Sequence, residues 1–374
     1  MQAVLLFDKT NEPKMKEKVL WSLSRVPFKL ADPLEPPFPN DLIVHIDVPI
    51  YGWMPWAPVN ILAYNPETYM DAWTPYLSRF DAVVFEHDSD RQRFQQQHLS
   101  VTTWTLEQLS QQIYLPKARV QLPPSLPIDK CPPISIITLL YNRRKFFELA
   151  CHNIMLSDYP KDKIEWVIVE DSDDINEDAS DRVVQVAMKA SPVNVIYIPL
   201  DKKTPIGEKR NLGIKKATNN VILMMDDDDH YPTTSFRRRV SWLLMHPWKP
   251  RVTSCTTIAC YDLVRGVSAV NTPAFTLPLR QRISEATLCF YKNFWEEKGF
   301  PSSSMSEGEG FLEGRELDVL ELPPQQIIVA LSHKKNISGR RVIAPDAKPG
   351  CFWGFPKEFL VFLHSLADIQ VESV

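Results

Sequence analysis

Glycine is scarce in this sequence. The 374 residues include 11 glycines and 32 prolines, whereas average usage would give roughly 26 and 19 in a chain of this length. Neither a GxGxxG motif nor a P-loop occurs, which excludes the glycine-rich backbone loops that commonly cradle phosphate groups. If the protein binds a nucleotide, carboxylates and a metal ion must therefore hold it.

The sequence also lacks a long apolar run and a long block of basic residues. Its longest apolar stretches, such as "ISIITLLY" and "FLVFL", are far too short to cross a bilayer, which takes about 20 residues. We therefore expect no transmembrane segment. We also expect no signal peptide, because "MQAVLLFDKT" has no charged n-region. The formal net charge of −4 gives no general attraction to nucleic acid, so no nucleic-acid partner is expected.

The cysteines give no sign of a metal site or a disulfide framework. Six cysteines are scattered along the chain, and none forms a CxxC pair. A reducing compartment is the simplest interpretation of this pattern. We therefore expect a cytoplasmic protein.

Two α/β segments are predicted, with a proline-rich stretch between them. Residues 1–114 alternate apolar runs with helical patterns, which indicates a smaller domain with a parallel sheet. Residues 115–133 predict an extended linker. Residues 134–374 form the second domain, whose C-terminal helix is expected to dock on it. Because the first domain lacks a nucleotide fingerprint, we expect it to act as a scaffold or in acceptor binding.

The second segment has the pattern of a Rossmann-like, mostly parallel sheet. Apolar runs of strand length occur at 134–141, 164–170, 193–200 and 220–225, and helical patterns separate them. In such sheets, ligands bind beyond the carboxyl ends of the strands. The residues that follow each run are therefore the first candidates for a site.

Acidic residues follow two of these strands. Glu170 and Asp171 come after the second run, and the four carboxylates 226–229 come directly after the fourth. Adjacent carboxylates repel one another, and their pKa values rise unless a cation neutralises the charge. Oxygen ligands at this density suit Mg²⁺ or Mn²⁺. A solvated acidic turn is the alternative interpretation.

The order of motifs around these clusters resembles that of family 2 glycosyltransferases, which have the GT-A fold. The resemblance covers about residues 134–340. It rests on the following segments, which match the family's pattern in order and spacing: Tyr141-Asn142-Arg143, Tyr159-Pro160, Glu170-Asp171, Arg210-Asn211-Leu212-Gly213 and Asp226-Asp227-Asp228-Asp229. The sequence departs from that pattern at Leu139-Leu140, where the family often has Pro-Thr, and at Glu170, where the family has Asp.

The resemblance implies a donor site for a nucleotide-diphosphate sugar. Asp171 would accept a hydrogen bond from the nucleotide base, and Asp226 would lie near the donor ribose. Tyr141 and Asp227 belong to the same matched motifs and are assigned to the donor site with them.

The resemblance also implies which residues neutralise the negative charges of the donor. Asp228 would ligate the metal ion that bridges the diphosphate. Lys209 or Arg210 would add positive charge near the base or the phosphates. Arg210 could instead simply pair with an acidic neighbour. His333, in "VALSHKKNISGRR", occupies the place of a late metal-ligating histidine, although a structural role is the alternative.

The acceptor side is implied for the segment "SEATLCFYKNFWEEKGFPSSSMSEGEGFLEGR". In the family, an acidic residue of this region acts as the catalytic base. The usual Glu-Asp pair is absent here, and Glu309 and Glu307 are the candidates, with Glu309 favoured. A solvated acidic loop is the alternative for each.

The favoured function is that of a metal-dependent glycosyltransferase that inverts the anomeric centre, and inversion is implied by the resemblance alone. The donor would be a nucleotide-diphosphate sugar, with a UDP-sugar favoured over a GDP-sugar. The acceptor would be a hydroxyl of a glycan or another glycoconjugate. The alternatives are a catalytically degenerate module that binds a glycan or nucleotide, and a nucleotidyltransferase, since paired aspartates and a metal also serve that chemistry.

Overall fold

The structure is a computed structural model, which describes residues 3–7, 15–24, 26–35, 38, 40–112, 126–246, 248–274, 277–322, 324, 326–336, 350–351 and 353–369. The chain divides into two compact units. Unit 1 consists of Met1–Leu122 with Pro273–Arg282, and unit 2 consists of Pro123–Thr272 with Ile283–Val374. Most of the predicted linker, residues 115–125, lies outside the described residues.

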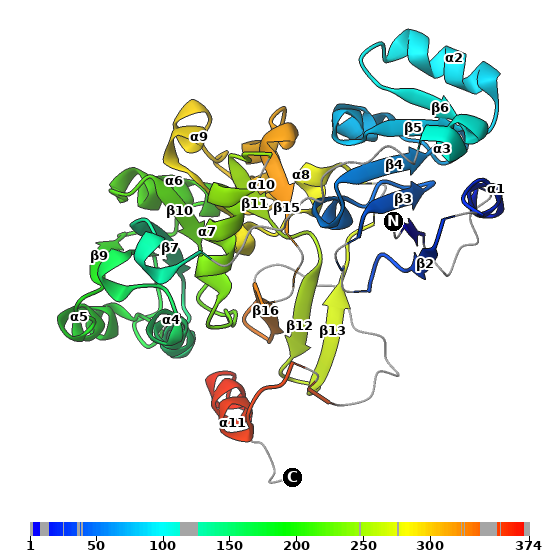
Figure 1. Cartoon of the computed structure of the whole chain (residues 1–374). Helices are drawn as coiled ribbons and strands as arrows, with labels where there is room; N and C mark the ends of the chain where they lie inside the picture. Colours follow the sequence, from blue (N-terminus) through cyan, green and yellow to red (C-terminus); the bar gives the residue numbers. More distant parts are fainter. Residues whose placement is uncertain are drawn as a thin grey trace. The chain divides into compact units, whose positions relative to one another are not determined.

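The described strands of unit 1 form a six-stranded sheet, and each neighbouring pair is parallel (Figure 1). The order across the sheet is β2 (Phe28–Ala31), β1 (Ala3–Leu6), β3 (Leu42–Ile46), β4 (Val59–Ala63), β5 (Ala82–Phe85) and β6 (Thr103–Thr105). The other elements of this unit are α1 (Lys16–Ser22), η1 (Tyr51–Trp56), η2 (Asp71–Arg79), α2 (Asp88–Gln97), α3 (Leu106–Gln112) and α8 (Leu279–Arg282).

Both faces of this sheet are buried, as is usual for parallel sheets. On one face, Leu5 belongs to an apolar cluster that also holds Val19 of α1. On the other face, Val4 packs with Trp53 of η1. Because successive side chains of a strand point to opposite faces, the short apolar run of β1 contributes to both cores.

Unit 2 is built on a seven-stranded sheet. Its order is β15 (Val319–Glu321), β11 (Val252–Ser254), β14 (Cys289–Tyr291), β10 (Val221–Met224), β7 (Ile134–Leu140), β8 (Ile164–Glu170) and β9 (Asn194–Pro199). Strands β10, β7, β8 and β9 are parallel, and β14 runs antiparallel to both of its neighbours. The carboxyl ends of β10, β7 and β8 therefore meet at one edge of the sheet.

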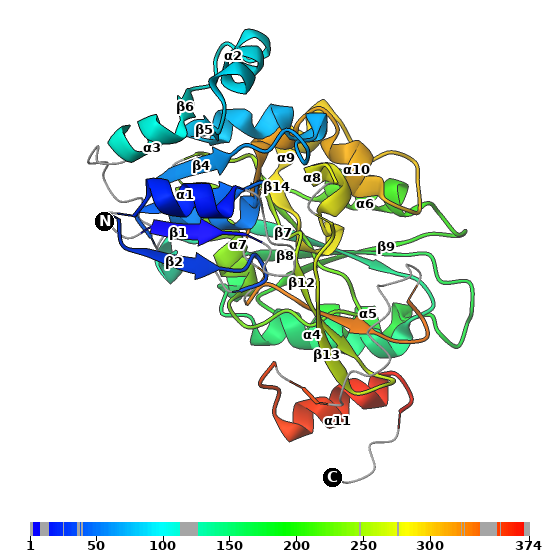
Figure 2. The same ribbon diagram turned by 90° about the vertical axis from the view of Figure 1, so that its right-hand side faces the viewer.

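Helices cover both faces of the parallel part of this sheet. Figures 1 and 2 show α4 (Arg144–Leu156) and α5 (Ser180–Lys189) on one face and α6 (Ile206–Lys216) on the other. A Cβ atom at Gly213 of α6 would lie 2.8 Å from Cγ2 of Ile137, so this glycine permits α6 to pack close to β7. The remaining helical elements are η3 (Ile128–Lys130), η4 (Lys161–Lys163), α7 (Ser235–Met245), η5 (Glu285–Thr287), α9 (Lys292–Glu297), α10 (Glu307–Leu312) and η6 (Glu316–Asp318).

A second, three-stranded sheet and the last helix complete unit 2. The sheet has the order β13 (Val267–Asn271), β12 (Ile258–Asp262) and β16 (Val329–Ser332). Helix α11 (Lys357–Leu366) contributes Leu363 to an apolar cluster that also contains Phe146 of α4 and Leu331 of β16. The C-terminal helix thereby ties the small sheet to α4.

The predicted fold class is confirmed. The chain has a mixed α/β architecture in which a mostly parallel sheet follows a smaller α/β region. Within the described ranges, none of the helices has the length and apolar character that crossing a membrane requires.

One histidine is buried in the sheet of unit 1. His45 of β3 is fully buried, and its Nδ1 accepts the backbone N–H of Ile50 at 3.0 Å. Its proton therefore lies on Nε2, which donates to Asn60 Oδ1 at 3.1 Å. Burial lowers the pKa of His45 to about 4, although the hydrogen bond to Asn60 opposes the shift. The neutral ring is thus part of the folded state.

Unit 1 should therefore lose stability on mild acidification. The folded pKa of about 4 lies below the ordinary value of 6.5, so the unfolded chain binds the proton first. The contribution of His45 is present above pH 6.5 and falls as the pH drops towards 4, by up to about 3 kcal/mol. We would measure urea midpoints at pH 7, 6 and 5 from hydrogen exchange of peptides that contain β3 and β4.

The variant His45→Gln should flatten this pH dependence. His87→Gln is the matched control, because the side chain of His87 is exposed on the same unit. An unchanged slope in His45→Gln would contradict the assignment.

Candidate active site

The acidic residues predicted from the sequence lie at the carboxyl ends of adjacent parallel strands. Asp171 follows β8, and the aspartate turn, residues 226–229, follows β10. Between them lies β7, which is followed by Tyr141 and Arg143. The register of these strands brings the two acidic clusters and a cation to one edge of the sheet.

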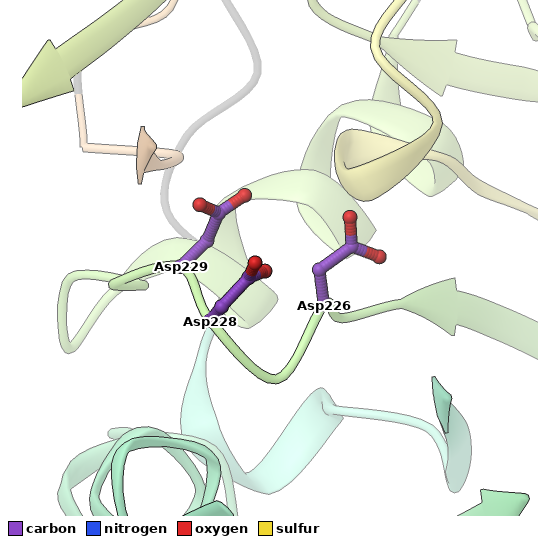
Figure 3. A group of neighbouring side chains, drawn as sticks. All are labelled: Asp226, Asp228 and Asp229. Carbon is purple, nitrogen blue, oxygen red and sulfur yellow. The ribbon is translucent and has the colours of Figure 1, made fainter. Parts of the chain in front are cut away.

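Three side chains of the aspartate turn converge (Figure 3). Asp226, Asp228 and Asp229 each offer a carboxylate oxygen, and these oxygens all lie within 4.8 Å of one another. Asp228 and Asp229 are buried, whereas 31% of the Asp226 side chain is exposed. An all-oxygen set of this spacing fits Mg²⁺ or Mn²⁺, which bind through carboxylates and complete their shell with substrate phosphates and water.

Asp229 also has a structural task. Its Oδ1 accepts the backbone N–H of Leu331 in β16 at 2.9 Å, and its carbonyl oxygen accepts Nδ2 of Asn153 at 2.8 Å. These bonds connect the aspartate turn to the small sheet and to α4. The position of the carboxylates is thus set by both layers that flank the turn.

Arg143 is the internal counter-ion of the turn. Its NH2 lies 2.9 Å from Asp227 Oδ1, and its NH1 pairs with Asp228 Oδ2. Burial alone would lower the pKa of Arg143, but the carboxylates of Asp227 and Asp228 outweigh it and raise the pKa. For Asp227, burial raises the pKa well above its usual range, with Arg143 opposing. The sequence analysis placed Arg143 in a motif but gave it no role.

His333 forms a hydrogen bond with Asp228. Both residues were predicted to bind the metal ion. Its Nε2 lies 3.1 Å from Asp228 Oδ2, and its Nδ1 accepts the backbone N–H of Lys335 at 3.2 Å. Nε2 therefore carries the proton and donates it to the carboxylate. Asn336 Nδ2 donates to the same oxygen at 3.0 Å. His333 lies outside the three-carboxylate group, and its role as a ligand stays a prediction.

Two of the residues assigned to the nucleotide form a buried ion pair. Lys209 Nζ donates to Asp171 Oδ1 at 2.5 Å, and the backbone N–H of Thr204 donates to Asp171 Oδ2 at 2.8 Å. Burial lowers the pKa of Lys209, while Asp171 opposes the shift. The structure thus joins two residues that the resemblance assigned to the donor site, and each carboxylate oxygen keeps a further lone pair for a ligand.

Tyr141 lies beside this pair and is partly exposed, with Lys209 Nζ 5.8 Å from the centre of its ring. Its hydroxyl donates to Asp173 Oδ2 at 3.1 Å, and Lys203 Nζ lies 4.1 Å from the centre of its ring. Glu170, where the sequence departs from the family pattern, uses its carboxylate for hydrogen bonds within the fold. It accepts the backbone N–H of Ala179 at 2.8 Å and the hydroxyl of Tyr197 at 2.8 Å. Glu170 therefore stabilises the segment that leads into α5.

In the segment predicted for the acceptor side, Glu307 is buried and pairs with Arg210. Arg210 Nε donates to Glu307 Oε1 at 2.9 Å, and Arg210 NH2 lies 3.8 Å from Asp226 Oδ1. Glu309 lies two residues further along α10, and side chains two apart on a helix do not share a face. The side chain of Glu309 therefore leaves α10 on a different face from that of Glu307. The choice between the two as base stays a prediction.

Sequence reasoning missed Glu285. This residue begins η5, and its Oε1 accepts the backbone N–H of Gly308 at 3.2 Å. Burial and the charge of Glu307 raise the pKa of Glu285 to about 7, with Arg210 opposing. Glu285 lies inside the segment assigned to the acceptor side, but a single glutamate in an irregular stretch gives no pattern that would single it out.

Helix α6 is fixed to the acceptor segment by a glycine. The backbone N–H of Gly207 donates to Ser303 O at 2.8 Å, and a Cβ atom at Gly207 would lie 1.9 Å from Pro301 O. No side chain fits there without displacing the backbone of residues 301–303. Because Lys209 and Arg210 follow in the same helix, this contact also sets where both cations lie.

Comparison with known proteins identifies one family. Residues 135–247 match the model of Glycosyl transferase family 2, which confirms the resemblance over the segment that carries the donor-side motifs. No curated protein sequence matches the chain.

Two solved structures are similar to parts of the chain. The mannosyltransferase PcManGT from Pyrobaculum calidifontis, in complex with GDP-Man and Mn²⁺, is 18% identical over 55% of this chain and 58% of its own, with a TM-score of 0.43. TarS 1–349 of S. aureus, in complex with UDP-GlcNAc, is 17% identical over 54% of this chain and 59% of its own, with a TM-score of 0.42. The chain thus spans less than two thirds of either structure.

Gly207→Ala tests whether α6 and the acceptor segment are fixed together. Alanine favours a helix over glycine by about 1 kcal/mol, yet the clash with Pro301 should lower the free energy of unfolding of unit 2 by about 1–3 kcal/mol. Lys216→Ala, at an exposed position of the same helix, is the control and should be near neutral. Urea denaturation followed by hydrogen exchange of α6 peptides would measure both. A Gly207→Ala variant as stable as the wild type would contradict the contact.

Proposed function

Because residues 135–247 carry the sequence of a Glycosyl transferase family 2 domain, we propose that the protein is a metal-dependent glycosyltransferase. It transfers a hexose or pentose from a nucleotide-diphosphate sugar, preferably a UDP-sugar, with a GDP-sugar as the alternative. The acceptor is a hydroxyl of a glycan or another glycoconjugate. The observation that carries the proposal is the three-carboxylate group of Asp226, Asp228 and Asp229, which follows β10 at the same end of the sheet as Asp171 after β8.

Asp226, Asp228 and Asp229 would hold Mn²⁺ or Mg²⁺. A bound cation stabilises the negative charge that develops on the departing diphosphate. Arg143 keeps Asp228 in place through its ion pair. Asp226 is the most exposed of the three and would face the donor. The two buried aspartates would hold the ion together with Asp226, and the ion would supply positive charge to the donor phosphates.

Asp171, Lys209 and Tyr141 would bind the nucleotide. The aromatic ring offers a stacking surface, and the carboxylate accepts a hydrogen bond from a base N–H group. The Asp171–Lys209 pair is buried, so it is held in one geometry before the donor arrives. This preorganisation lowers the entropic cost of binding.

The acceptor hydroxyl would attack the anomeric carbon from the face opposite the diphosphate, which inverts the configuration. Its proton passes to a carboxylate of the acceptor side as the new bond forms. Glu309 and Glu307 on α10 are the bases that the sequence predicts. Localisation in the cytoplasm is part of the same proposal.

The metal role predicts the behaviour of Asp228→Asn. Loss of one carboxylate should weaken Mn²⁺ binding and lower metal-dependent turnover by roughly 10²–10⁴-fold, because a catalytic cation contributes several kcal/mol of transition-state stabilisation. The assay is release of UDP or GDP from a panel of nucleotide sugars, with Mn²⁺ binding followed by electron paramagnetic resonance. Asp201→Asn, at an exposed position, is the control. Wild-type turnover in Asp228→Asn, or full activity in excess chelator, would refute the metal role.

The base pocket predicts a loss of nucleotide affinity in Asp171→Asn. The amide keeps the size of the side chain but loses its charge. Affinity for the nucleoside diphosphate should fall by about 1.5–3 kcal/mol, the scale of a hydrogen bond to a charged group. Isothermal titration calorimetry would compare it with Asp162→Asn, an exposed position. An unchanged Kd in a folded Asp171→Asn protein would show that Asp171 does not contact the base.

The same assays separate this proposal from the other two functions considered. A nucleotidyltransferase would release pyrophosphate from a nucleoside triphosphate and leave nucleotide sugars intact. A degenerate binding module would bind a nucleotide or glycan with no turnover of any donor.

A further inference from the structure

Glu285 occupies space that a side chain at position 308 would need. A Cβ atom on Gly308 would lie 2.7 Å from both Cγ and Oε1 of Glu285. The carboxylate therefore rests directly on the backbone of α10, in the place of the missing side chain. The hydrogen bond from Gly308 N–H uses one of its oxygens, and the residue remains partly exposed. The carboxylate has further lone pairs that can accept a hydrogen bond from a ligand.

Arg210 supplies an unused donor, and its charge acts on the Glu285 carboxylate. Only 5% of Arg210 is exposed, and its NH1 is buried without a hydrogen-bond partner among the described residues. Its Nε is bonded to Glu307. The charges of Glu307, Asp226 and Glu285 all act on this guanidinium. A buried donor without a partner is costly, and a bound hydroxyl oxygen would satisfy it.

Glu285 is also tied to the donor side of the site. Its neighbour Ala286 accepts the hydroxyl of Tyr231 at 3.0 Å, and the same Tyr231 oxygen accepts the backbone N–H of Asp226 at 2.9 Å. Two hydrogen bonds therefore connect η5 to the first residue of the aspartate turn. The segment that carries Glu285 cannot shift without disturbing Asp226.

We propose that Glu285 is the catalytic base of the transfer and that Glu307 is a positioning residue that holds Arg210. The inference rests on the proposed function and names the acceptor-binding group of that same site. Arg210 NH1 donates to the acceptor oxygen, and the carboxylate of Glu285 accepts the acceptor's proton. Glu307 is bonded to Arg210 Nε and buried, so it keeps its charge partner throughout.

The step balances without a further reactant. The acceptor O–H bond breaks, its proton moves to Glu285, and the oxygen's electron pair forms the new bond to the anomeric carbon. The bond from that carbon to the diphosphate breaks, and its electrons leave with the nucleoside diphosphate. A carboxyl group with a pKa of about 7 is matched to this task at neutral pH.

The first test compares four glutamine variants. The donors are UDP-glucose, UDP-N-acetylglucosamine and GDP-mannose with Mn²⁺, and water serves as the acceptor. The variants are then compared by nucleotide release from the donor that the wild type turns over fastest. Glu285→Gln should lower kcat by about 10²–10⁴-fold while the donor Kd stays near that of the wild type. Glu313→Gln, an exposed position at the end of α10, is the matched control. If Glu285→Gln retains turnover, or if Glu309→Gln or Glu307→Gln causes the larger loss of kcat, the assignment is overturned.

The second test uses the pH profile, which a merely structural role would not move. Wild-type kcat/KM should rise with pH and level off above about pH 7, because Glu285 must be ionised to accept a proton. Removal of the Glu307 charge in Glu307→Gln removes one cause of the raised pKa of Glu285 and frees Arg210 to lower it. The rising part of the pH profile of kcat/KM should then move to lower pH in Glu307→Gln. In Glu285→Gln, the residual rate should no longer rise with pH in this range. A rise that survives unchanged in Glu285→Gln would assign it to another group.

The two proposals fail in different ways. If the wild-type protein releases nucleotide from none of the three donors, the proposed function fails, and the role of Glu285 fails with it. If the wild type turns over a donor and Glu285→Gln does so equally well, the proposed function stands and only the inference about Glu285 is overturned. Loss of donor affinity in Glu285→Gln would also overturn it, because the residue would then support the fold or the donor.

Discussion

The compensation of negative charge at one strand end is the constraint on which the rest of the site depends. Four consecutive aspartates follow β10, and three of them are buried. Such a turn is stable only where cations or hydrogen-bond donors meet each carboxylate. Arg143 meets Asp227 and Asp228, and the backbone of β16 meets Asp229. The charge that remains at the exposed edge is what can attract a metal ion.

Helix α6 divides its two consecutive cations between two halves of the site. Lys209 pairs with Asp171, which is proposed for the donor side, and Arg210 pairs with Glu307, which is proposed for the acceptor side. Neighbouring residues on a helix point about 100° apart, so one helix can serve both halves. Gly207 fixes the start of this helix against residues 301–303. The spacing between the Asp171–Lys209 and Arg210–Glu307 pairs is therefore set largely by a single helix.

The placement of the residues proposed for the donor half could be predicted from the sequence because its signals are local. An apolar run followed by acidic residues marks a strand end, and the strand order of a parallel sheet then brings Asp171 and the aspartate turn together. Arg143 and Lys209 received no partners in that analysis, because ion pairs such as Arg143–Asp228 join residues 85 positions apart. Glu285 and Gly308 could not be related at all, since their contact depends on how η5 and α10 pack. The positions of strands and of charged residues can be predicted from the sequence, whereas the packing between irregular segments cannot.

The path of the chain between the two units has a consequence for how such a protein can change over time. Unit 2 is interrupted after Thr272, and residues 273–282 belong to unit 1 before the chain returns at Ile283. Unit 1 therefore consists of two separate segments of the chain and cannot be removed by a single truncation. Deletion of residues 1–122 would leave residues 273–282 without the unit to which they belong, and the chain returns to unit 2 two residues before Glu285. A shuffled or truncated descendant would have to rebuild this connection first, so the two units are expected to be inherited together.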